Sequence, residues 1–516
     1  MLLSDLLARN AQLYPEDVAL IELKPSSDYR RAITWREFDE RANRVANALI
    51  KSGIKKGDKV IHLMMNSINW LAVYFGIIRT GAWAVPLNFR FTSKEIKYCV
   101  DIAEARVMIL GEEFTDRIKE IQNDLSTIEK YVFVGQNVPS GMDTFESFIA
   151  PSSIKMPDVG LRPDDVCGLY FTSGTTGTPK PIVLTHKNME FACVVEQKHH
   201  YQQKDDNFIL IPPLYHTGAK MHWFGSLLTG GCTTILMEIS PKNILEAVHK
   251  ERGTIVWLLV PWAQDILMAL DRGEIKLSDY DLSQWRLMHI GAQPVPPSLV
   301  KHWLEYFPKM QYDTNYGLSE STGPGCIHLG IENVHKVGAI GKAGYGWQVR
   351  IVDDKGIDVK QGSNGEIIIK GDGVMREYYK NPEKTAETLK DGWLYTGDIA
   401  RMDEDRFIWI TDRKKDVIIT GGENIYPVEI EDVLQSHPKI YDVAVIGVHD
   451  ERLGEIATAI IDPKPGATLT EKEVLDFCTQ HLSHFKRPRK IIFDKVPRNP
   501  TGKIEKPKLR EKYSKL

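Results

Sequence analysis

The sequence predicts an α/β fold. A large N-terminal α/β body of several subdomains, one of them β-rich, is expected to precede a small C-terminal α+β domain. Three observations support this. The 516 residues exceed what a single compact core holds. Helical and strand-like patterns alternate as far as about residue 340. The pattern then changes near Gly341 and again at Asp412.

The alternating part predicts a parallel sheet with helices on both faces. Thr34 and Glu37 form a capping box that opens a helix through Ile50. Strands are expected at 59–64, 82–86, 107–110, 131–134, 166–171, 181–184, 208–213, 233–237, 255–260 and 287–290. Helices are expected at 69–80, 188–201, 223–229, 242–251, 262–270 and from about 297.

Short strands separated by Gly, Asp and Lys dominate residues 340–412 and predict the β-rich subdomain. Its strands are expected at 349–352, 365–369 and 407–411. Beyond residue 412, strands at 417–420, 442–448 and 456–461 alternate with helices at 427–436 and 471–482. About a hundred residues is a normal domain size. The predicted domains are therefore 1–412 and 413–516.

Composition excludes several classes. The net charge of −4 does not favour nucleic acid or an acidic membrane surface as a partner. Six scattered cysteines without paired spacing predict buried thiols in a reducing compartment, not disulfides or zinc. The N-terminus lacks a basic segment, and no secretory signal or integral membrane segment is expected. These features favour a cytoplasmic protein, and a homodimer is compatible with them.

A polar loop from Thr172 to Lys180 lies between two strand-like runs. Its glycines let backbone N–H groups turn inward, its hydroxyls add donors, and Lys180 adds a charge. Such a concavity suits a polyanion such as phosphate. An ordinary hairpin turn explains the same composition. The Walker phosphate loop does not fit, because a strand follows instead of a helix.

Polar turns also follow three later strands, at 214–218, 291–294 and 313–320. Ligands bind at this edge of open α/β sheets. For several single residues, the sequence allows both a ligand-binding role and an ordinary structural role. Tyr316 suits stacking on a base or a place in the core. Glu320 suits Mg²⁺ or an exposed surface. Asp398 and Arg413 suit ribose or surface turns, and Lys503 lies on a Pro/Gly-rich loop near the end of the chain.

Taken together and in order, five motifs resemble the adenylate-forming superfamily, specifically its acyl- and aryl-CoA synthetases. The resemblance covers essentially the whole chain. The motifs are Tyr170–Lys180, Tyr316–Glu320, Gly392–Asp398, Asp412-Arg413 with Gly421–Asn424, and Pro497–Lys503.

The resemblance implies a two-step reaction. A carboxylic acid attacks the α-phosphate of Mg²⁺-ATP to give acyl-AMP and pyrophosphate, and coenzyme A then takes the acyl group. It also implies a nucleotide site. The residues expected there are Thr172, Ser173, Gly174, Thr175, Thr176, Gly177, Lys180, Gly291, Ala292, Gln293, Thr314, Asn315, Tyr316, Gly317, Ser319, Asp398, Arg413 and Lys503.

The resemblance implies further roles. Lys503 would bridge the carboxylate and the α-phosphate, Glu320 would bind the metal, and His216 would gate the acyl site. The C-terminal domain would be mobile and would rotate about Lys415 between the steps, and Gly421 and Gly422 would then line the coenzyme A tunnel. The acyl pocket is expected at His216, Gly218, Gly291 and Gly323.

Glycines in the expected pocket favour a medium-sized apolar acid: medium-chain, alicyclic or aromatic. No arginine there suits a second carboxylate, although Lys220 is close in sequence. Alternatives remain. The chain also resembles carnitine-type CoA ligases, which would mean a small polar acid. An adenylation enzyme that loads a carrier protein, a luciferase-like oxidising enzyme and a degenerate nucleotide-binding scaffold are the other candidates.

Three positions depart from the family pattern. Ser319 replaces the commoner threonine and keeps the hydroxyl. Pro181 follows Lys180, where glycine or alanine is usual, and removes a backbone donor. Arg406 replaces the glycine of an Asp-Glu-Asp-Gly turn. If that turn needs a positive φ, Arg406 is strained or the turn differs.

Overall fold

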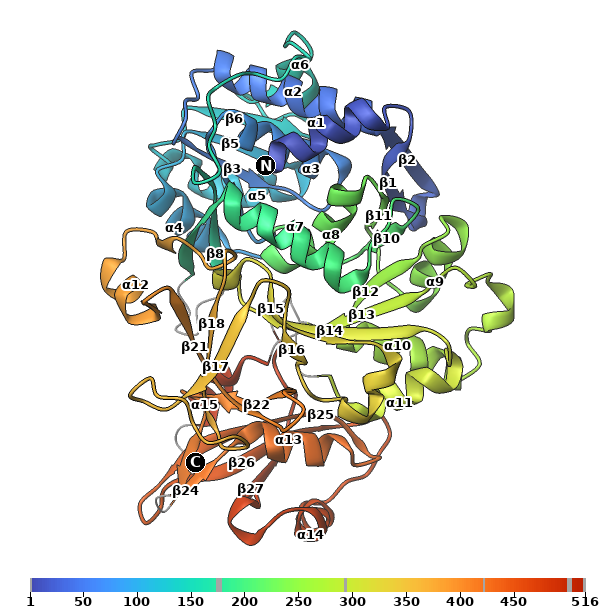
Figure 1. The fold of residues 1–516 in the computed structure, drawn as a ribbon, viewed down its shortest axis with the longest axis vertical. Helices are drawn as coiled ribbons and strands as arrows, with labels where there is room; N and C mark the ends of the chain where they lie inside the picture. The colour runs from blue at the N-terminus through green and yellow to red at the C-terminus, as the bar shows by residue number, and fades with distance from the viewer. Residues whose placement is uncertain (1, 173–178, 292–294, 421–422, 499–503, 514–516) are drawn as a thin grey trace.

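The structure is a computed structural model that describes residues 2–172, 179–291, 295–420, 423–498 and 504–513. The N-terminal body contains two large mixed sheets and a smaller antiparallel one. The C-terminal domain lies at the opposite end of the long axis from the N-terminal helices (Figure 1). The α/β body with a smaller C-terminal domain is the architecture that the sequence predicts.

The first large sheet has eight strands in the order β19-β9-β8-β4-β3-β5-β6-β7. Strands β4, β3, β5, β6 and β7 are mutually parallel, and β9 runs antiparallel to β8. The bounds are β3 Lys59–Leu63, β4 Trp83–Pro86, β5 Val107–Gly111, β6 Lys130–Val134, β7 Asp143–Thr144, β8 Val166–Thr172, β9 Lys180–Thr185 and β19 Glu377–Tyr378.

The second large sheet has nine strands in the order β16-β15-β14-β13-β12-β10-β11-β1-β2. Its centre from β14 to β1 is parallel, and both edges are antiparallel. The bounds are β1 Val18–Lys24, β2 Tyr29–Thr34, β10 Asn207–Leu210, β11 Cys232–Leu236, β12 Ile255–Leu259, β13 Leu287–Gly291, β14 Gln311–Gly317, β15 Pro324–Leu329 and β16 Lys342–Ala343.

Strand β14 corrects one prediction. Residues 313–317 were expected to form a polar turn after a short strand, yet they belong to β14 itself. Their backbone groups pair with β15 on one side, and Asp313 pairs with β13 on the other. Sheet pairing on both sides therefore outweighs the polar composition of this segment.

The predicted helices of the body are present, but the helix predicted at 223–229 begins at Thr217, so the last two residues of the predicted turn at 214–218 are helical. Thr34 caps α2 in a reciprocal capping box with Glu37. Eleven of the twelve residues of α3 are buried, so this helix lies inside the protein. The bounds are α1 Leu3–Leu13, α2 Trp35–Lys51, α3 Ile68–Arg79, α4 Ser93–Ala103, α5 Thr115–Ile121, α6 Phe145–Ile149, α7 His186–His200, α8 Thr217–Thr229, α9 Pro241–Lys250, α10 Val260–Asp271, α11 Pro297–Tyr306 and α12 Pro382–Thr388.

The β-rich part forms a sheet in the order β17-β18-β21-β20, with β22 paired to β21. The C-terminal domain has the order β24-β23-β26-β25, with β27 paired to β26. The bounds are β17 Gln348–Val352, β18 Gly365–Lys370, β20 Leu389–Lys390, β21 Trp393–Met402, β22 Ile408–Arg413, β23 Ile418–Thr420, β24 Glu423–Ile425, α13 Pro427–Gln435, β25 Ile440–Asp450, β26 Gly454–Pro463, α14 Glu471–His481, β27 Lys490–Phe493 and α15 Lys506–Tyr513.

Three other sequence-based expectations have structural outcomes. All six cysteines are free thiols, and five of them are buried. Arg406 has a φ of +67°, so the turn keeps the left-handed conformation that suits glycine, and the exposed arginine is strained. Within the described ranges, no helix has the length and apolar character needed to cross a membrane.

Candidate functional site

A cavity of about 1500 Å³ lies between the body and the C-terminal domain. Residues of β8, β9, β14, β21 and β22 line it from the body, and Arg498 and Ile504–Lys508 line it from the C-terminal domain. It brings together many of the predicted site residues. They are Thr172, Lys180, His216, Gly218, Thr314, Asn315, Tyr316, Gly317, Ser319, Glu320, Gly323, Asp398, Arg413 and Lys415.

The other predicted residues divide into two groups. Gly291 ends β13 and is not among the lining residues, but a Cβ atom there would lie 3.8 Å from both His289 Nε2 and Thr314 Oγ1. It therefore lies just behind the wall of the cavity. The rest fall outside the described residues, namely Ser173, Gly174, Thr175, Thr176, Gly177, Ala292, Gln293, Gly421, Gly422 and Lys503.

Tyr316, Asp398 and Arg413 form one polar group. The Tyr316 hydroxyl donates to Asp398 Oδ2 at 2.5 Å, and Arg413 Nε lies 3.4 Å from Asp398 Oδ1. Asp398 and Arg413 face each other across β21 and β22, so strand pairing sets their separation. Burial and the adjacent Asp398 carboxylate raise the pKa of Tyr316 well above its ordinary value. The tyrosine therefore remains a donor that orients the carboxylate.

Glu320 follows β14 in a short 3₁₀ turn, and its backbone carbonyl accepts from Met375 N–H at 2.8 Å. The Tyr378 hydroxyl donates to Glu320 Oε1 at 2.8 Å. Burial and the Glu320 charge raise the pKa of Tyr378, so this hydroxyl stays protonated. A carboxylate fixed in this way and facing a cavity suits a hard cation such as Mg²⁺.

The start of α8 connects two parts of the site. His216 is the N-cap residue of this helix, and its ring lies 4.2 Å from that of Tyr215, centroid to centroid. The next residue, Thr217, donates its hydroxyl to Ser319 Oγ at 3.3 Å. This contact places the hydroxyl of Ser319, the residue found where related enzymes have threonine, next to the turn that contains His216.

Part of the cavity lining is apolar. A Cβ atom at Gly218 would lie 3.4 Å from Trp257 Cη2, and one at Gly323 would lie 3.3 Å from Ala192 Cβ. The described lining residues between Pro212 and Ile340 include no lysine or arginine. Their apolar members are Tyr215, Trp257, Leu259, Val260, Val295, Leu318, Val337, Ala339 and Ile340, with Pro212, Pro213, Pro261, Pro296, Pro297 and Pro324.

Lys220 does not serve this part of the cavity. Its side chain is fully buried, and its Nζ lies 4.4 Å from the centroid of the Tyr170 ring and 5.2 Å from that of Tyr74. Burial lowers the pKa of Lys220 to about 7. The lysine thus lies in the interior among aromatic rings and is not positioned to meet a second carboxylate of an acid.

Charged side chains lie on both sides of the cavity, and one of them bonds across it. Asp412, at the end of β22, accepts from the backbone N–H of Val428 in α13 at 3.1 Å. Lys415 is partly exposed at the start of the C-terminal domain. Burial of part of its side chain and the nearby charges of Arg413, Arg510 and Lys180 lower its pKa to about 8, against the opposing effect of Asp416. Arg498, just before the predicted Lys503, forms a bidentate pair with Asp442, both bonds 2.7 Å long.

Sequence reasoning missed Tyr378 and Trp257, and it included Thr217 only as part of the turn at 214–218, without its contact to Ser319. One local feature could have drawn attention to Tyr378: it belongs to the pair Tyr378-Tyr379, just before Asn381, which caps α12. Thr217 follows directly after His216 and shares its turn. Trp257 lies in an apolar strand, where nothing local distinguishes a residue that lines a cavity from one in the core.

Comparisons with known proteins agree with this geometry. Residues 7–379 match the family model described as AMP-binding enzyme, and residues 429–503 match the AMP-binding enzyme C-terminal domain. The chain is 31% identical to a long-chain-fatty-acid–CoA ligase (FadD13) of Mycobacterium tuberculosis, over 99% of this chain and 98% of that one. It is 34% identical to a feruloyl-CoA synthase of Amycolatopsis, over 93% and 94% of the two chains.

A solved structure supports the same assignment. The anthranilate CoA ligase AuaEII, in complex with anthranoyl-AMP, superposes with a TM-score of 0.90 at 28% identity, covering 99% of this chain and 97% of that one. The fold, the two matched domains and relatives that span nearly the whole chain agree. The chain belongs to the AMP-binding enzymes of the adenylate-forming superfamily and is an AMP-forming acid–coenzyme A ligase.

Proposed function

We propose that the acid is medium-sized and apolar: medium-chain, alicyclic or aromatic. The observation that carries this proposal is the wall around Gly218. A Cβ atom at Gly218 would contact Trp257, and no lysine or arginine occurs among the described lining residues from Pro212 to Ile340. An acid with a second carboxylate would bury a charge there without a counterion, which is costly. The named relatives act on both fatty and aromatic acids.

We assign the nucleotide to the side of the cavity that holds Tyr316 and Asp398. Tyr316 would pack on adenine, and Asp398 would accept from the ribose hydroxyls with Arg413 beside it. The hydrogen bond from Tyr316 and the strand pairing of Arg413 support this assignment, because both hold the Asp398 carboxylate in place before the ligand arrives. The loop that ends at Lys180 would hold the β- and γ-phosphates.

The first step joins two anions, since the acid carboxylate attacks the α-phosphate and pyrophosphate leaves. We assign the charge that makes this possible to Lys503. A positioned cation in a site that excludes water stabilises the charge at phosphorus more than it stabilises the separated reactants. Its neighbours Arg498 and Ile504 line the cavity, which supports placing its loop there in the first step.

Glu320 fits the Mg²⁺ that such a reaction uses, because its carboxylate is a hard oxygen ligand at the cavity wall and is oriented by Tyr378. The Ser319 hydroxyl would contact phosphate. Bound Mg²⁺ would supply charge neutralisation to the leaving pyrophosphate.

In the second step the thiol of coenzyme A attacks the acyl carbonyl and AMP leaves. We propose that rotation about Lys415 withdraws the Lys503 loop and brings Gly421 and Gly422 to line the pantetheine arm. Glycine permits the close backbone approach that such a thin tunnel needs. The free thiols of the chain fit a cytoplasmic location.

The test is pyrophosphate release measured across a panel of acids, with and without free coenzyme A. Hexanoate, octanoate, cyclohexanecarboxylate, benzoate and cinnamate are expected to support turnover, and succinate, malonate and carnitine are not. If carnitine were the only acid to support turnover, the substrate would be a small polar acid and not an apolar one. Adenylation that never proceeds to a thioester with free coenzyme A would point to a carrier protein as the acceptor.

A further inference from the structure

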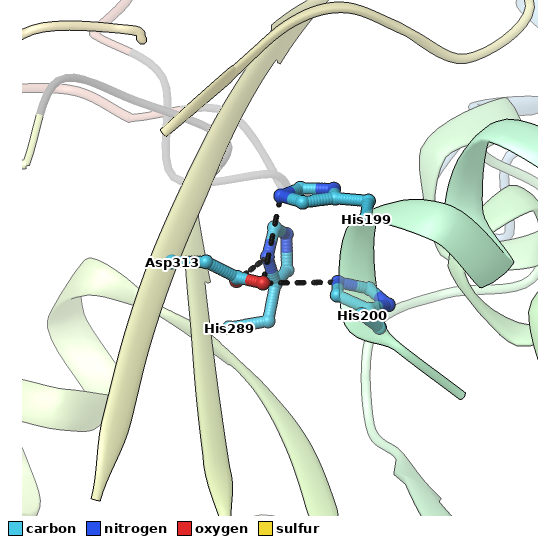
Figure 2. A group of neighbouring side chains, drawn as sticks. All are labelled: His199, His200, His289 and Asp313. Carbon is cyan, nitrogen blue, oxygen red and sulfur yellow. Dashed lines mark hydrogen bonds and ion pairs between the residues drawn. The ribbon is translucent and has the colours of Figure 1, made fainter. Parts of the chain in front are cut away.

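Three histidines and one aspartate converge inside the body, apart from the residues assigned to the reaction. His199 and His200 occupy the last turn of α7, His289 lies on β13, and Asp313 lies on β14. Figure 2 shows the helix and the two strands directing these four side chains toward one another. Their relative exposure is 1% or less. The grouping therefore combines three parts of the fold that are distant in the sequence.

We propose that His199, His200, His289 and Asp313 bind one divalent transition-metal ion, zinc in the first instance. One ligand atom from each residue can be chosen so that all four lie within 4.8 Å of one another. A tetrahedral zinc ion with bonds of about 2.0–2.1 Å separates its ligand atoms by about 3.3 Å. Asp313 Oδ2 lies 3.5 Å from His199 Nε2 and 3.7 Å from His200 Nε2, close to that spacing.

A second carboxylate lies behind the two helical histidines. Glu196 Oε2 is 3.8 Å from His199 Nδ1 and 3.6 Å from His200 Nδ1, and its side chain is also fully buried. Both rings therefore turn Nδ1 toward Glu196 and Nε2 toward Asp313. These separations exceed the length of a hydrogen bond, so the carboxylate would have to move closer to orient the two rings as a carboxylate does at histidine metal sites.

Charge and ligand type favour the same ion. Glu196 and Asp313 place two buried carboxylates on opposite sides of the histidine pair, and a divalent ion would provide a counter-charge for them. Imidazole and carboxylate ligands suit zinc, copper, iron or nickel better than magnesium or calcium.

The position suggests a structural ion. His289 precedes Gly291 by two residues, and Asp313 directly precedes Thr314 at the cavity wall. The His289 ring lies 5.6 Å from that of Trp257, which lines the acyl part of the cavity. An ion here would tie α7, β13 and β14 together directly behind the substrate site. Four protein ligands leave no open position of the kind a catalytic zinc needs.

The decisive measurement is the metal content of the full chain, purified without a polyhistidine tag, by inductively coupled plasma mass spectrometry. About one equivalent of zinc per chain is expected. After removal by a chelator, added Co²⁺ should give the visible absorption of a tetrahedral site. His289→Gln should lose the ion, whereas Glu196→Gln should keep the stoichiometry and weaken affinity by about 10–100-fold.

His328→Gln is the matched control. His328 is fully buried on the adjacent strand β15, and its ring nitrogens contact the carbonyls of Ala339 and Asn333 instead of the cluster. It should retain full metal content. The proposal fails if wild-type protein, as purified and after incubation with Zn²⁺ and desalting, holds less than about a tenth of an equivalent. It also fails if the His289 and His328 variants hold equal amounts. The wild-type measurement decides the matter even if a variant does not fold.

Discussion

The Tyr378 hydroxyl that donates to Glu320 offers a direct test of the proposed metal and phosphate site. Replacing Tyr378 by Phe removes one hydrogen bond, of 2.8 Å, and little volume. A hydrogen bond to a charged group contributes about 1.5–3 kcal/mol, which corresponds to about a 10- to 150-fold change in rate or affinity. Because the carboxylate would no longer be held for the cation, we expect a loss of this size in adenylate formation.

The assay follows pyrophosphate release as a function of Mg²⁺ at saturating acid, and separately the conversion of supplied acyl-AMP to acyl-CoA. The variant should need more Mg²⁺ in the first reaction and behave like wild type in the second. Tyr379→Phe is the control, because the neighbouring ring packs against Trp83 and Lys59 and not against Glu320. An equal fall in both half-reactions, or an unchanged Mg²⁺ requirement, would refute the role given to Glu320.

Four other changes test separate parts of the structure. Lys503→Ala should abolish adenylate formation and spare thioester formation from acyl-AMP, and comparable losses in both would count against the proposed two-conformation cycle. Gly218→Val should lower kcat/KM for benzoate and cinnamate by about 10–200-fold while sparing propanoate, because it fills space beside Trp257. Arg406→Gly should raise thermal stability by about 0.5–1 kcal/mol, since relief of a positive φ outweighs the added freedom of the unfolded chain; an unchanged melting temperature would show that the turn carries no strain. Burial raises the pKa of Asp412 to about 6, so the folded chain keeps this proton after the unfolded chain has released it, and stability falls as pH rises from about 4 to 6. Asp412→Asn lacks this titration. The melting temperature of the variant minus that of wild type should therefore increase from pH 4.5 to pH 7, and a difference that does not change with pH would contradict the raised pKa.

Local patterns predicted most elements of the fold. The capping box at Thr34 placed α2, and apolar runs on either side of the polar loop placed β8 and β9. The division into two sheets was not predictable in this way. Strand β1 pairs with β11, more than two hundred residues later, and no local periodicity encodes that partner. Strand β14 was misplaced for the same reason, because the buried Asp313 is accommodated by distant histidines on β13 and α7.

The site shows the same division. Motif order placed Tyr316, Glu320, Asp398 and Arg413, and these residues share one cavity. Their supporting partners came only from the three-dimensional structure. Tyr378 is 58 residues from Glu320. Such contacts depend on how separate sheets pack against one another, and one sequence carries little information about that packing.

The pairing of β21 with β22 has a mechanical consequence. Asp398, assigned to the sugar, faces Arg413 in this ladder, and the next residue donates its backbone N–H to the Gly397 carbonyl at 2.8 Å. The chain is therefore anchored to the body up to residue 414, and the proposed pivot is the residue immediately beyond. Rotation of the C-terminal domain would begin next to the nucleotide site. Asp398 and Arg413, which are proposed to bind the ribose, would not move with it. The acyl-AMP intermediate would then keep its position on the body while the C-terminal groups near its acyl carbonyl are exchanged.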